Sequence, residues 1–269
     1  ALISENYGCD HIPILSFYSC DDFADILWPL PEDWALACAP PTRVAPPAWD
    51  AREDAAVFRG SATGRGVEPA TNARLRLAAM RDTKHGLDVG VVGWNDRWKC
   101  TRRGSPPRRP DAARLRAAGI DLVPRLDMQE QQRFKYVVYM AGHCASSRYS
   151  ALMRQGSVIL KVEDPPGVPG QLWFFHKLEP WRDHVPVKAD LSDLKDQLAW
   201  CRRHPPECRA MVRRCRALAH WSSGVEARPT RRGRRGGGAS SPCAGSLGRR
   251  SGRGGTDRRC AAWRWPCHS

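Results

Sequence analysis

The stretch KYVVYMAGHCASSRYSALMRQGSVILKV, residues 135–162, decides the fold. Its first part, residues 136–140, is an apolar run rich in β-branched and aromatic residues, as in a buried strand. A helix is expected next, with Ser146 or Ser147 as its N-cap. Residues 157–162 form a second apolar run. The stretch therefore predicts a βαβ unit with two parallel strands and a right-handed crossover.

The loop between the first strand and this helix has the features of an anion site. In a parallel sheet it opens at the carboxyl ends of the strands, where α/β folds bind ligands. Free N–H groups at a helix start favour an anion, and Arg148 adds a fork of donors that fits a phosphate. Taken alone, the segment is equally compatible with an ordinary βαβ unit in which Arg148 is a solvated surface residue.

Residues 57–76, VFRGSATGRGVEPATNARLR, contain a second loop of this kind. It joins a strand that ends near Phe58 to a helix opened by Pro69 or Asn72. Glycines permit close approach of a ligand, and hydroxyls, amides and arginines form a nest that cradles a diphosphate. The glycine patterns of a P-loop and of a dinucleotide fingerprint are both missing. The polar side chains offered by this loop include Arg59, Ser61 and Thr63.

With a third segment, these two loops resemble glycosyltransferase family 90, the protein O-glucosyl- and O-xylosyltransferases and the fungal capsule-associated xylosyltransferases. The resemblance covers about residues 11–218, and its most specific part is LEPWRDHVPVKADLSDL, residues 178–194. The family usually has His-Tyr before Val-Pro-Val, where this chain has Asp183 and His184, so the role of that pair is open. The other matching segments are IPILSF (12–17), DILWP (25–29), FRGS (58–61), GHCASSR (142–148) and GSV (156–158).

The resemblance implies an α/β fold of the GT-B type, with two Rossmann-like domains facing each other across a cleft. Residues 56–221 would be the domain that binds the nucleotide-sugar, and residues 1–55 a remnant of the acceptor-side domain. The implied reaction moves glucose or xylose from UDP-glucose or UDP-xylose, with inversion, to a hydroxyl of a protein serine or a glycan. The implied location is the secretory pathway, in the endoplasmic reticulum or Golgi lumen.

Matched position by position, the family's donor site falls on Ser61 and on the run from His143 to Arg148. A further arginine of the family lies a few residues beyond the serine. Because residues 64–70 are inserted here, its counterpart is either Arg74, our first choice, or Arg65. The expected donor-binding residues are therefore Arg59, Ser61, Thr63, Arg74, His143, Cys144, Ala145, Ser146, Ser147 and Arg148.

The catalytic base is the one expected functional group that the resemblance does not match to a residue of this sequence. The family uses an aspartate that falls at or just before residue 1 of this chain. Asp10 is the fallback, and it would need a shortened loop; otherwise it is a solvated turn residue. We therefore interpret the chain as a fragment that binds a UDP-sugar but transfers it poorly, since a missing general base typically costs about 10²–10⁴-fold in rate.

The net charge of +15 resembles that of a nucleic-acid-binding protein, but it is unevenly distributed. Residues 222–269 hold eleven arginines against Glu226 and Asp257, a net +9 of the total. This Arg/Gly-rich tail has few aliphatic residues and is expected to be disordered. The alternative function is a basic interaction protein that binds nucleic acid through the tail. We favour the transferase and expect no nucleic-acid partner, because the tail also reads as sequence beyond the true end of the domain.

Composition bears on three further features: transmembrane helices, disulfides and metal sites. The chain has no run of 18 apolar residues, so no transmembrane helix is expected. Its eleven cysteines include no CxxC pair and suit a luminal protein with a few disulfides, or buried thiols. Histidines are scattered and the DxD triplet of many metal-dependent sugar transferases is absent. We therefore expect no metal and no cofactor besides the UDP-sugar donor.

The remaining segments read as alternating helices and strands, which favours a largely parallel sheet. A strand is expected around residues 90–93. Three further helices are predicted, from Asp111 to Ala118, from Leu191 to Trp200 with Asp190 or Ser192 at its start, and from Glu207 to about Ala219. An aromatic cluster is predicted to be a packed seam rather than a sugar-stacking platform; it comprises Trp173, Phe174, Phe175 and Trp181.

Overall fold

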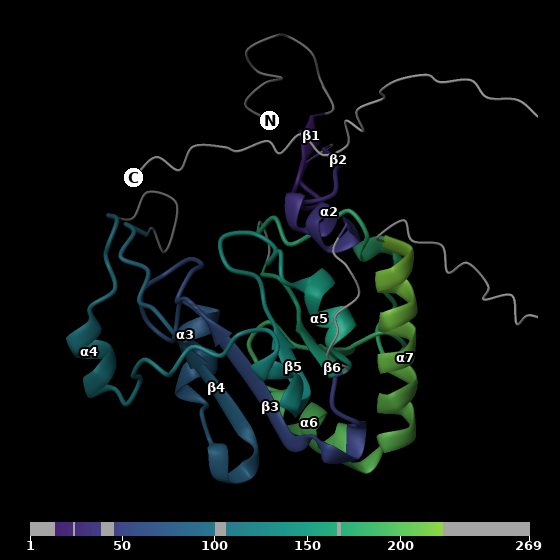
Figure 1. Cartoon of the computed structure of the whole chain (residues 1–269). Helices are drawn as coiled ribbons and strands as arrows, with labels where there is room; N and C mark the ends of the chain where they lie inside the picture. Colours follow the sequence, from purple (N-terminus) through teal and green to yellow (C-terminus); the bar gives the residue numbers. More distant parts are fainter. Residues whose placement is uncertain (1–13, 24, 39–45, 100–105, 166–167, 223–269) are drawn as a thin grey trace, which may run out of the picture. The chain divides into compact units, whose positions relative to one another are not determined.

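The computed structural model describes residues 14–23, 25–38, 46–99, 106–165 and 168–222 (Figure 1). At its centre is a sheet of five parallel strands in the spatial order β4-β3-β5-β6-β7. This is a Rossmann-like α/β fold, as the sequence predicts. The strands are β3 (Glu53–Gly60), β4 (Leu87–Val91), β5 (Phe134–Tyr139), β6 (Val158–Val162) and β7 (Val185–Val187).

Helices cover both faces of the sheet, which explains why its central strands are almost continuously apolar. Alternate strand residues enter two separate cores: Phe58 lies in one and Val57 in the other. Helices α3 (Ala73–Ala79) and α6 (Leu194–Arg203) contribute Leu77 and Leu198 to the core that contains Phe58. Helix α5 (Tyr149–Gln155) contributes Leu152 to the other core.

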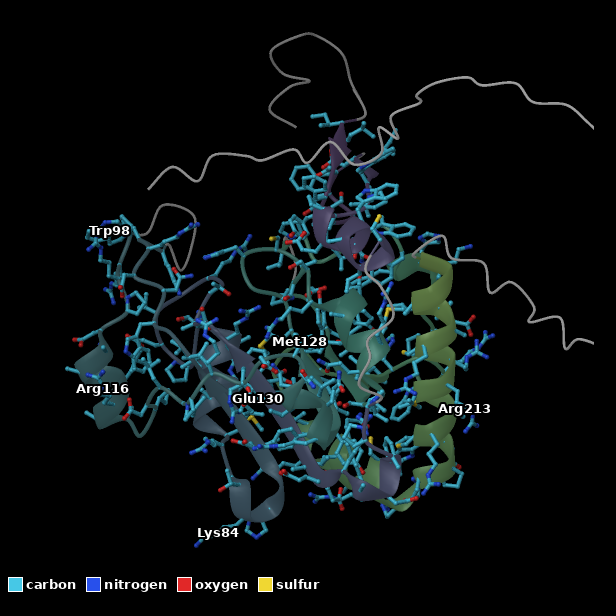
Figure 2. All side chains as sticks on the ribbon, viewed as in Figure 1. Lys84, Trp98, Arg116, Met128, Glu130 and Arg213 are labelled. Atoms are coloured by element: carbon cyan, nitrogen blue, oxygen red, sulfur yellow. The ribbon has the colours of Figure 1, made fainter. Side chains whose placement is uncertain are left out.

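Helix α7 (Pro205–Ser222) runs beside α5 and reaches both cores (Figure 1). Its Met211 lies in the core with Phe58, and its Cys215 in the core with Val57. Arg213, on the opposite side of the helix, projects away from the sheet (Figure 2). The helix therefore closes one flank of the domain with an apolar stripe and exposes Arg209 and Arg213 on its other side.

The strand order creates a switch point between β3 and β5. From β3 the chain crosses by α3 to β4 on one side, and from β5 it crosses by α5 to β6 on the other. The two helices lie on opposite faces, as right-handed crossovers in opposite directions require. Ligands of open α/β sheets bind outside the carboxyl ends of the strands at such a point. Both loops singled out from the sequence begin there, after Gly60 and after Tyr139.

The predicted start of α5 is wrong. The helix begins at Tyr149, and Arg148 stands at the N-cap position without a side-chain cap, so neither Ser146 nor Ser147 caps it. The reason is a tertiary contact: the hydroxyl of Tyr139 accepts a hydrogen bond from Ser146 N at 2.9 Å and donates one to Ser146 O at 3.2 Å. This holds residues 146–148 as a separate turn against the end of β5.

Other helix starts agree better with the sequence. Asn72 caps α3 and Asp111 caps α4 (Ala112–Ala117), as predicted. Helix α6 begins after Asp193 rather than after Asp190 or Ser192, because Leu191 adopts a positive φ of 64°. Helix α7 begins at Pro205 instead of Glu207, since proline is tolerated in a first helical turn.

The N-terminal described segment forms a small attachment to the sheet domain. A parallel pair of short strands, β1 (Leu15–Ser16) and β2 (Ile26–Leu27), precedes α2 (Pro31–Cys38). Buried Asp33 secures α2, because its carboxylate accepts hydrogen bonds from Ser150 Oγ and from Trp173 Nε1. Short 3₁₀ turns complete the fold at Trp49–Ala51, Thr83–His85, Glu130–Arg133 and Phe175–Lys177. Asp10 and residues 223–269 of the predicted tail lie outside the described residues, whereas Ser222, its first residue, ends α7.

Candidate functional site

Arg74, in the first turn of α3, ties together the two loops at the switch point. Its guanidinium donates hydrogen bonds to Ser61 O at 3.0 Å, Met140 O at 3.0 Å and Ala141 O at 3.1 Å. Asn72 places it there by capping the helix through Arg74 N at 3.0 Å. Burial, and secondarily the charge of Arg148, lower the pKa of Arg74 to about 10. Arg74 is thus a buried cation whose hydrogen-bond acceptors are neutral.

Arg148 approaches the same point from the turn before α5. Its guanidinium donates to the carbonyl oxygen of Arg59 and, at 3.4 Å, to Ser146 Oγ. Burial lowers its pKa from the usual arginine value. Arg74 and Arg148 both lie 5.7 Å from the ring centroid of Phe58. The two guanidinium groups therefore share one aromatic support at the end of β3.

Gly60 makes this double approach possible. A Cβ atom at this position would lie 3.1 Å from Arg148 Nη2 and 3.3 Å from Arg74 Nη1. It would also lie 2.9 Å from Phe58 Cζ, closer than real Cβ contacts. The glycine before Ser61 is thus required because two arginines fill the space that a side chain would occupy.

Lys99 is a third cation at the site, and the sequence analysis missed it. It is 4 % exposed, and its Nζ donates a hydrogen bond to Ala62 O, next to the carbonyl that Arg74 contacts. Burial, followed by the charge of Arg74, lowers its pKa to about 8. His143 lies nearby, and its pKa is lowered by burial and by Lys99. No motif marks Lys99, which reaches the loop by tertiary folding alone.

The cluster formed by Arg74, Lys99 and Arg148, called the cation cluster below, has an uncompensated charge. Within the described ranges, no carboxylate forms a salt bridge or hydrogen bond with any of the three. Carbonyl and hydroxyl oxygens satisfy their donors but do not neutralise them. Buried charges are normally paired, because desolvating them alone is costly. The arrangement therefore calls for an anionic ligand, and two or three cations match a diphosphate.

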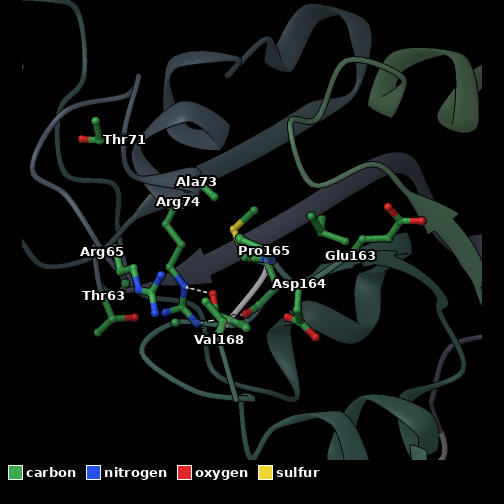
Figure 3. A pocket seen from close by; sticks show the side chains of 14 residues that line it. Thr63, Arg65, Thr71, Ala73, Arg74, Glu163, Asp164, Pro165 and Val168 are labelled. Carbon is green, nitrogen blue, oxygen red and sulfur yellow. Dashed lines mark hydrogen bonds between the residues drawn. The ribbon is translucent and has the colours of Figure 1, made fainter. Parts of the chain in front are cut away.

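A cavity of about 250 Å³ adjoins the cation cluster (Figure 3). Arg74 forms one wall, together with Thr63 from the loop after β3 and Gly142 from the loop after β5. The end of β6 and Asp164, which follows it, form the opposite side. Arg65 also lines the cavity near the guanidinium of Arg74 (Figure 3), so both alternatives for the family's second arginine reach the same place.

The structure brings most of the predicted donor-binding residues to this site. Ser61 and Thr63 follow β3, and His143 and Ser146 lie in the loop after β5. Ala145 is buried and donates its N–H to Pro169 O at 2.8 Å, so it positions the loop. Cys144 is half-buried, and burial raises the pKa of its thiol. Ser147 lies in the same turn, between Ser146 and Arg148.

Arg59 differs from the other predicted residues. Its side chain pairs with Asp88 at 2.7 Å and donates to the carbonyl oxygen atoms of Pro124 at 3.0 Å and Asp88 at 2.7 Å. As a residue within β3, it projects from a face of the sheet and not beyond the end of the strand. Its guanidinium is therefore occupied by structural partners, and only its carbonyl oxygen contacts the cation cluster.

Three of the four residues of the predicted aromatic cluster pack together in or against the core, and Asp183 of the third segment is buried. Phe174 and Phe175 pack in the core around Tyr149, with Trp173 against them, whereas Trp181 is exposed and contacts Trp200 instead. Asp183 is buried and accepts hydrogen bonds from Glu179 N at 2.9 Å and Arg214 Nε at 3.1 Å.

The described parts of the chain contain neither a cluster of metal ligands nor a membrane-spanning helix. No three His, Cys, Asp or Glu residues in those ranges lie together as a metal site requires. A metal-free site stays a prediction. Among the described helices, none has both the length and the apolar composition needed to cross a membrane.

The fold and the site define a Rossmann-like protein with a cluster of cations at its switch point. The model of the family "Glycosyl transferase family 90" matches residues 3–221, which include the cation cluster and the cavity. The chain therefore belongs to glycosyltransferase family 90, as its motifs indicate.

Individual relatives agree with this assignment. The chain is 35% identical over 213 residues to uncharacterized protein 035R of invertebrate iridescent virus 3, covering 75% of this chain and 19% of the relative. It is 32% identical over 87 residues to human protein O-glucosyltransferase 3, covering 32% and 16%. It is 25% identical over 229 residues to protein O-glucosyltransferase 1 of Rattus norvegicus, covering 76% and 50%. The chain thus spans about a fifth of the length of the viral relative and half of the last.

Proposed function

We propose that this chain binds a UDP-sugar at the carboxyl edge of its sheet and belongs to a glycosyltransferase that moves the sugar, with inversion, to a hydroxyl acceptor. One observation carries the proposal. Three cations from separate segments converge at the switch point: Arg74 and Lys99 are buried, and Arg148 is half-buried. Within the described residues, none of the three has a carboxylate partner. A diphosphate supplies the missing negative charge.

The same residues have a role in the chemistry. When the bond between sugar and UDP breaks, charge develops on the departing diphosphate. Fixed cations in a partly dehydrated site stabilise that charge without reorganising, and losing one such group typically costs a few kcal/mol of barrier. Arg74 and Arg148 are held by backbone carbonyls, so they are already oriented before the ligand arrives. Ser61 and Thr63 add hydroxyl donors beside them.

The choice of sugar and acceptor rests on the relatives. Two of them are named as protein O-glucosyltransferases, which favours UDP-glucose as donor and a protein hydroxyl as acceptor. UDP-xylose and a glycan are the competing pair. The proposed setting is the lumen of the secretory pathway.

A second domain is part of the proposal. In a GT-B enzyme an acceptor-side domain faces the nucleotide-binding domain. The short strands β1 and β2 expose Leu15, Ile26 and the neighbouring Trp28, an apolar group that suits packing against such a domain. The catalytic base would come from that side, with Asp10 as the candidate within this sequence.

A transfer assay tests the activity. The chain is incubated with UDP-glucose or UDP-xylose and with folded EGF-type repeats or simple glycans as acceptors. We expect measurable binding of the UDP-sugar and slow transfer. Robust turnover that Asp10→Asn abolishes would make Asp10 the base and contradict the expectation of slow transfer. Failure to bind either UDP-sugar would contradict the proposed function itself.

A further inference from the structure

Helices α6 and α7 meet at a corner that brings two cysteines together (Figure 1). Cys201 lies in the last turn of α6 and Cys208 in the first turn of α7, and His204 separates the two helices. Both cysteines are thiols here, and both side chains are fully buried in the core that contains Phe58. The corner therefore places two thiols in one apolar environment, shielded from solvent.

Hydrogen bonds at this corner hold the two thiols next to each other. Cys201 O accepts hydrogen bonds from His204 N at 3.3 Å and from Cys208 Sγ at 3.5 Å. Cys208 N donates to His204 O at 3.1 Å in the first turn of α7. The two thiol groups are also hydrogen-bonded to each other. The two sulfur atoms are thus already neighbours, as a disulfide requires.

Cys215, further along α7, is a buried thiol with a different partner. It is 3% exposed, and its Sγ donates to Asp183 O at 2.7 Å. Burial raises the pKa of Cys215 to about 12, so this thiol stays protonated. In the pair, by contrast, the mutual hydrogen bond raises the pKa of Cys201 and lowers that of Cys208. Thiol–disulfide exchange needs such a thiolate-forming cysteine beside a second thiol.

We propose that Cys201 and Cys208 are a disulfide-forming pair, which fastens the corner between α6 and α7 when it is oxidised by a small disulfide such as oxidised glutathione. The thiolate of Cys208 attacks one sulfur of the glutathione disulfide and releases one glutathione. Cys201 then loses its proton and displaces the second glutathione, which closes the bond between the two cysteines. Two protons and two electrons pass from the cysteines to the glutathione disulfide.

Burial decides when this exchange takes place. Both sulfur atoms are inaccessible in the folded chain, so they react when the corner opens locally or before α7 has docked during folding. The bond closes a short loop around His204, and it stabilises the fold mainly by restricting the unfolded chain.

The pair lies at the opposite edge of the sheet from the cation cluster. Arg202, next to Cys201, donates to Asp54 O at 3.1 Å near the start of β3, whereas the cavity adjoins the carboxyl ends of β5 and β6. The disulfide is therefore expected to change stability and not UDP affinity. The inference does not rest on the proposed function, and either can fail without the other.

Peptide mapping of the full chain tests the bond directly. The protein is equilibrated with reduced and oxidised glutathione, its remaining thiols are alkylated, and it is digested with trypsin. Because trypsin cleaves after arginine and lysine, a disulfide would join the peptides 196–202 and 204–209. We expect to find this linked pair in the oxidised protein and to lose it on reduction.

Three variants show which cysteines are needed and what the bond does. Cys201→Ala and Cys208→Ala should each abolish the linked pair, whereas Cys215→Ala, the matched control, should keep it. The melting temperature Tm of the oxidised wild type should exceed that of the reduced protein by about 5 °C. This difference should disappear in Cys201→Ala and in Cys208→Ala and persist in Cys215→Ala, even if each substitution lowers the Tm itself.

The contrary outcomes are distinct. Peptides 196–202 and 204–209 that stay unlinked at every ratio of the two glutathione forms would overturn the proposal, and so would linkage of either one to Cys215. A linked pair without a difference in Tm would overturn the fastening role. Calorimetric titration with UDP should give the same affinity for oxidised and reduced protein, and a change would overturn the separation of the pair from the cation cluster.

Discussion

Basic residues at the two edges of the parallel sheet have different kinds of hydrogen-bond partner. At the amino-terminal edge, arginines pair with carboxylates at or just before the start of β3: Arg133 with Glu53 at 3.1 Å, Arg202 with Asp54 at 3.4 Å and Arg209 with Asp50 at 2.6 Å. At the carboxyl edge, Arg74, Lys99 and Arg148 donate only to neutral oxygen atoms among the described residues.

These basic residues at the amino edge are paired within the protein, whereas those at the carboxyl edge remain available to an anionic ligand. The pairs at the amino edge are largely exposed, and exposed pairs contribute little to stability. At the carboxyl edge, Arg74 and Lys99 are buried and Arg148 is half-buried, so leaving them unpaired costs folding free energy. Unpaired cations are expected at a ligand-binding switch point, because a bound anion would neutralise their charge. Substitutions at the carboxyl edge should therefore change UDP affinity more than substitutions at the amino edge.

The largest effect is expected from Arg148→Met, which keeps the length of the side chain but removes its charge. UDP affinity should fall about 100-fold, because one or two hydrogen bonds between charged groups are lost, at about 1.5–3 kcal/mol each. Calorimetric titration measures the change. A dissociation constant equal to that of the wild type would contradict the role of Arg148 in the cation cluster.

A smaller loss is expected from Gly60→Ala. The added methyl group would lie within 3.3 Å of both guanidinium groups and must push them apart. We expect UDP affinity to fall about 10-fold, since the charged hydrogen bonds lose their alignment without disappearing. Gly119→Ala is the control, because it has a positive φ of 78° and no atom within 4 Å of the new Cβ. That variant should lose stability and keep UDP affinity; weaker UDP binding in both variants would refute the steric explanation.

A pH-dependent effect of a few-fold is expected from Lys99. Its pKa of about 8 lies within reach of experiment, and only the protonated amine attracts a diphosphate. UDP affinity should therefore be complete below pH 8 and decline as pH rises through about 8 in the wild type. The groups facing Lys99 are Arg74, which stays charged in this range, and His143, whose lowered pKa makes it neutral above pH 7.

Lys99→Met should bind UDP more weakly at pH 7 and lose the decline between pH 7 and 9. Lys99→Arg should keep its affinity across the same range, because arginine stays protonated. A decline that persists in Lys99→Met would assign the titration to another group.

The smallest effect is expected at the amino edge. Arg209→Met removes an exposed pair with Asp50, so the free energy of unfolding should change by no more than about 1 kcal/mol, and UDP affinity should not change. Thermal unfolding and calorimetry on the same sample measure both quantities. A loss of UDP affinity comparable to that of Arg148→Met would remove the contrast between the two edges.

Local signals were sufficient for much of this site. Apolar runs and glycines located both loops, and Asn72 was one of the two predicted helix starts, beside Pro69, because asparagine is a common N-cap. Arg74 and Arg148 lie close to these local signals, in or just before the first turn of a helix that follows a strand, which is why sequence and resemblance together found them.

The remaining features depend on contacts between distant segments. Lys99 reaches Ala62 across 37 residues, and nothing in its own neighbourhood marks it. The start of α5 is set by the Tyr139 hydroxyl, which no capping rule considers. Arg59 belongs to the matching motif, yet its place within β3 directs it to Asp88, and the register with β4 is a property of the folded sheet.

The proposed function requires the cation cluster to bind a diphosphate. Parallel calorimetric titrations with UDP and with uridine test this requirement, because the two ligands differ only in the diphosphate. We expect UDP to bind at least about 100-fold more tightly than uridine, and Arg148→Met to remove most of this difference. Equal affinity for UDP and uridine would contradict this requirement.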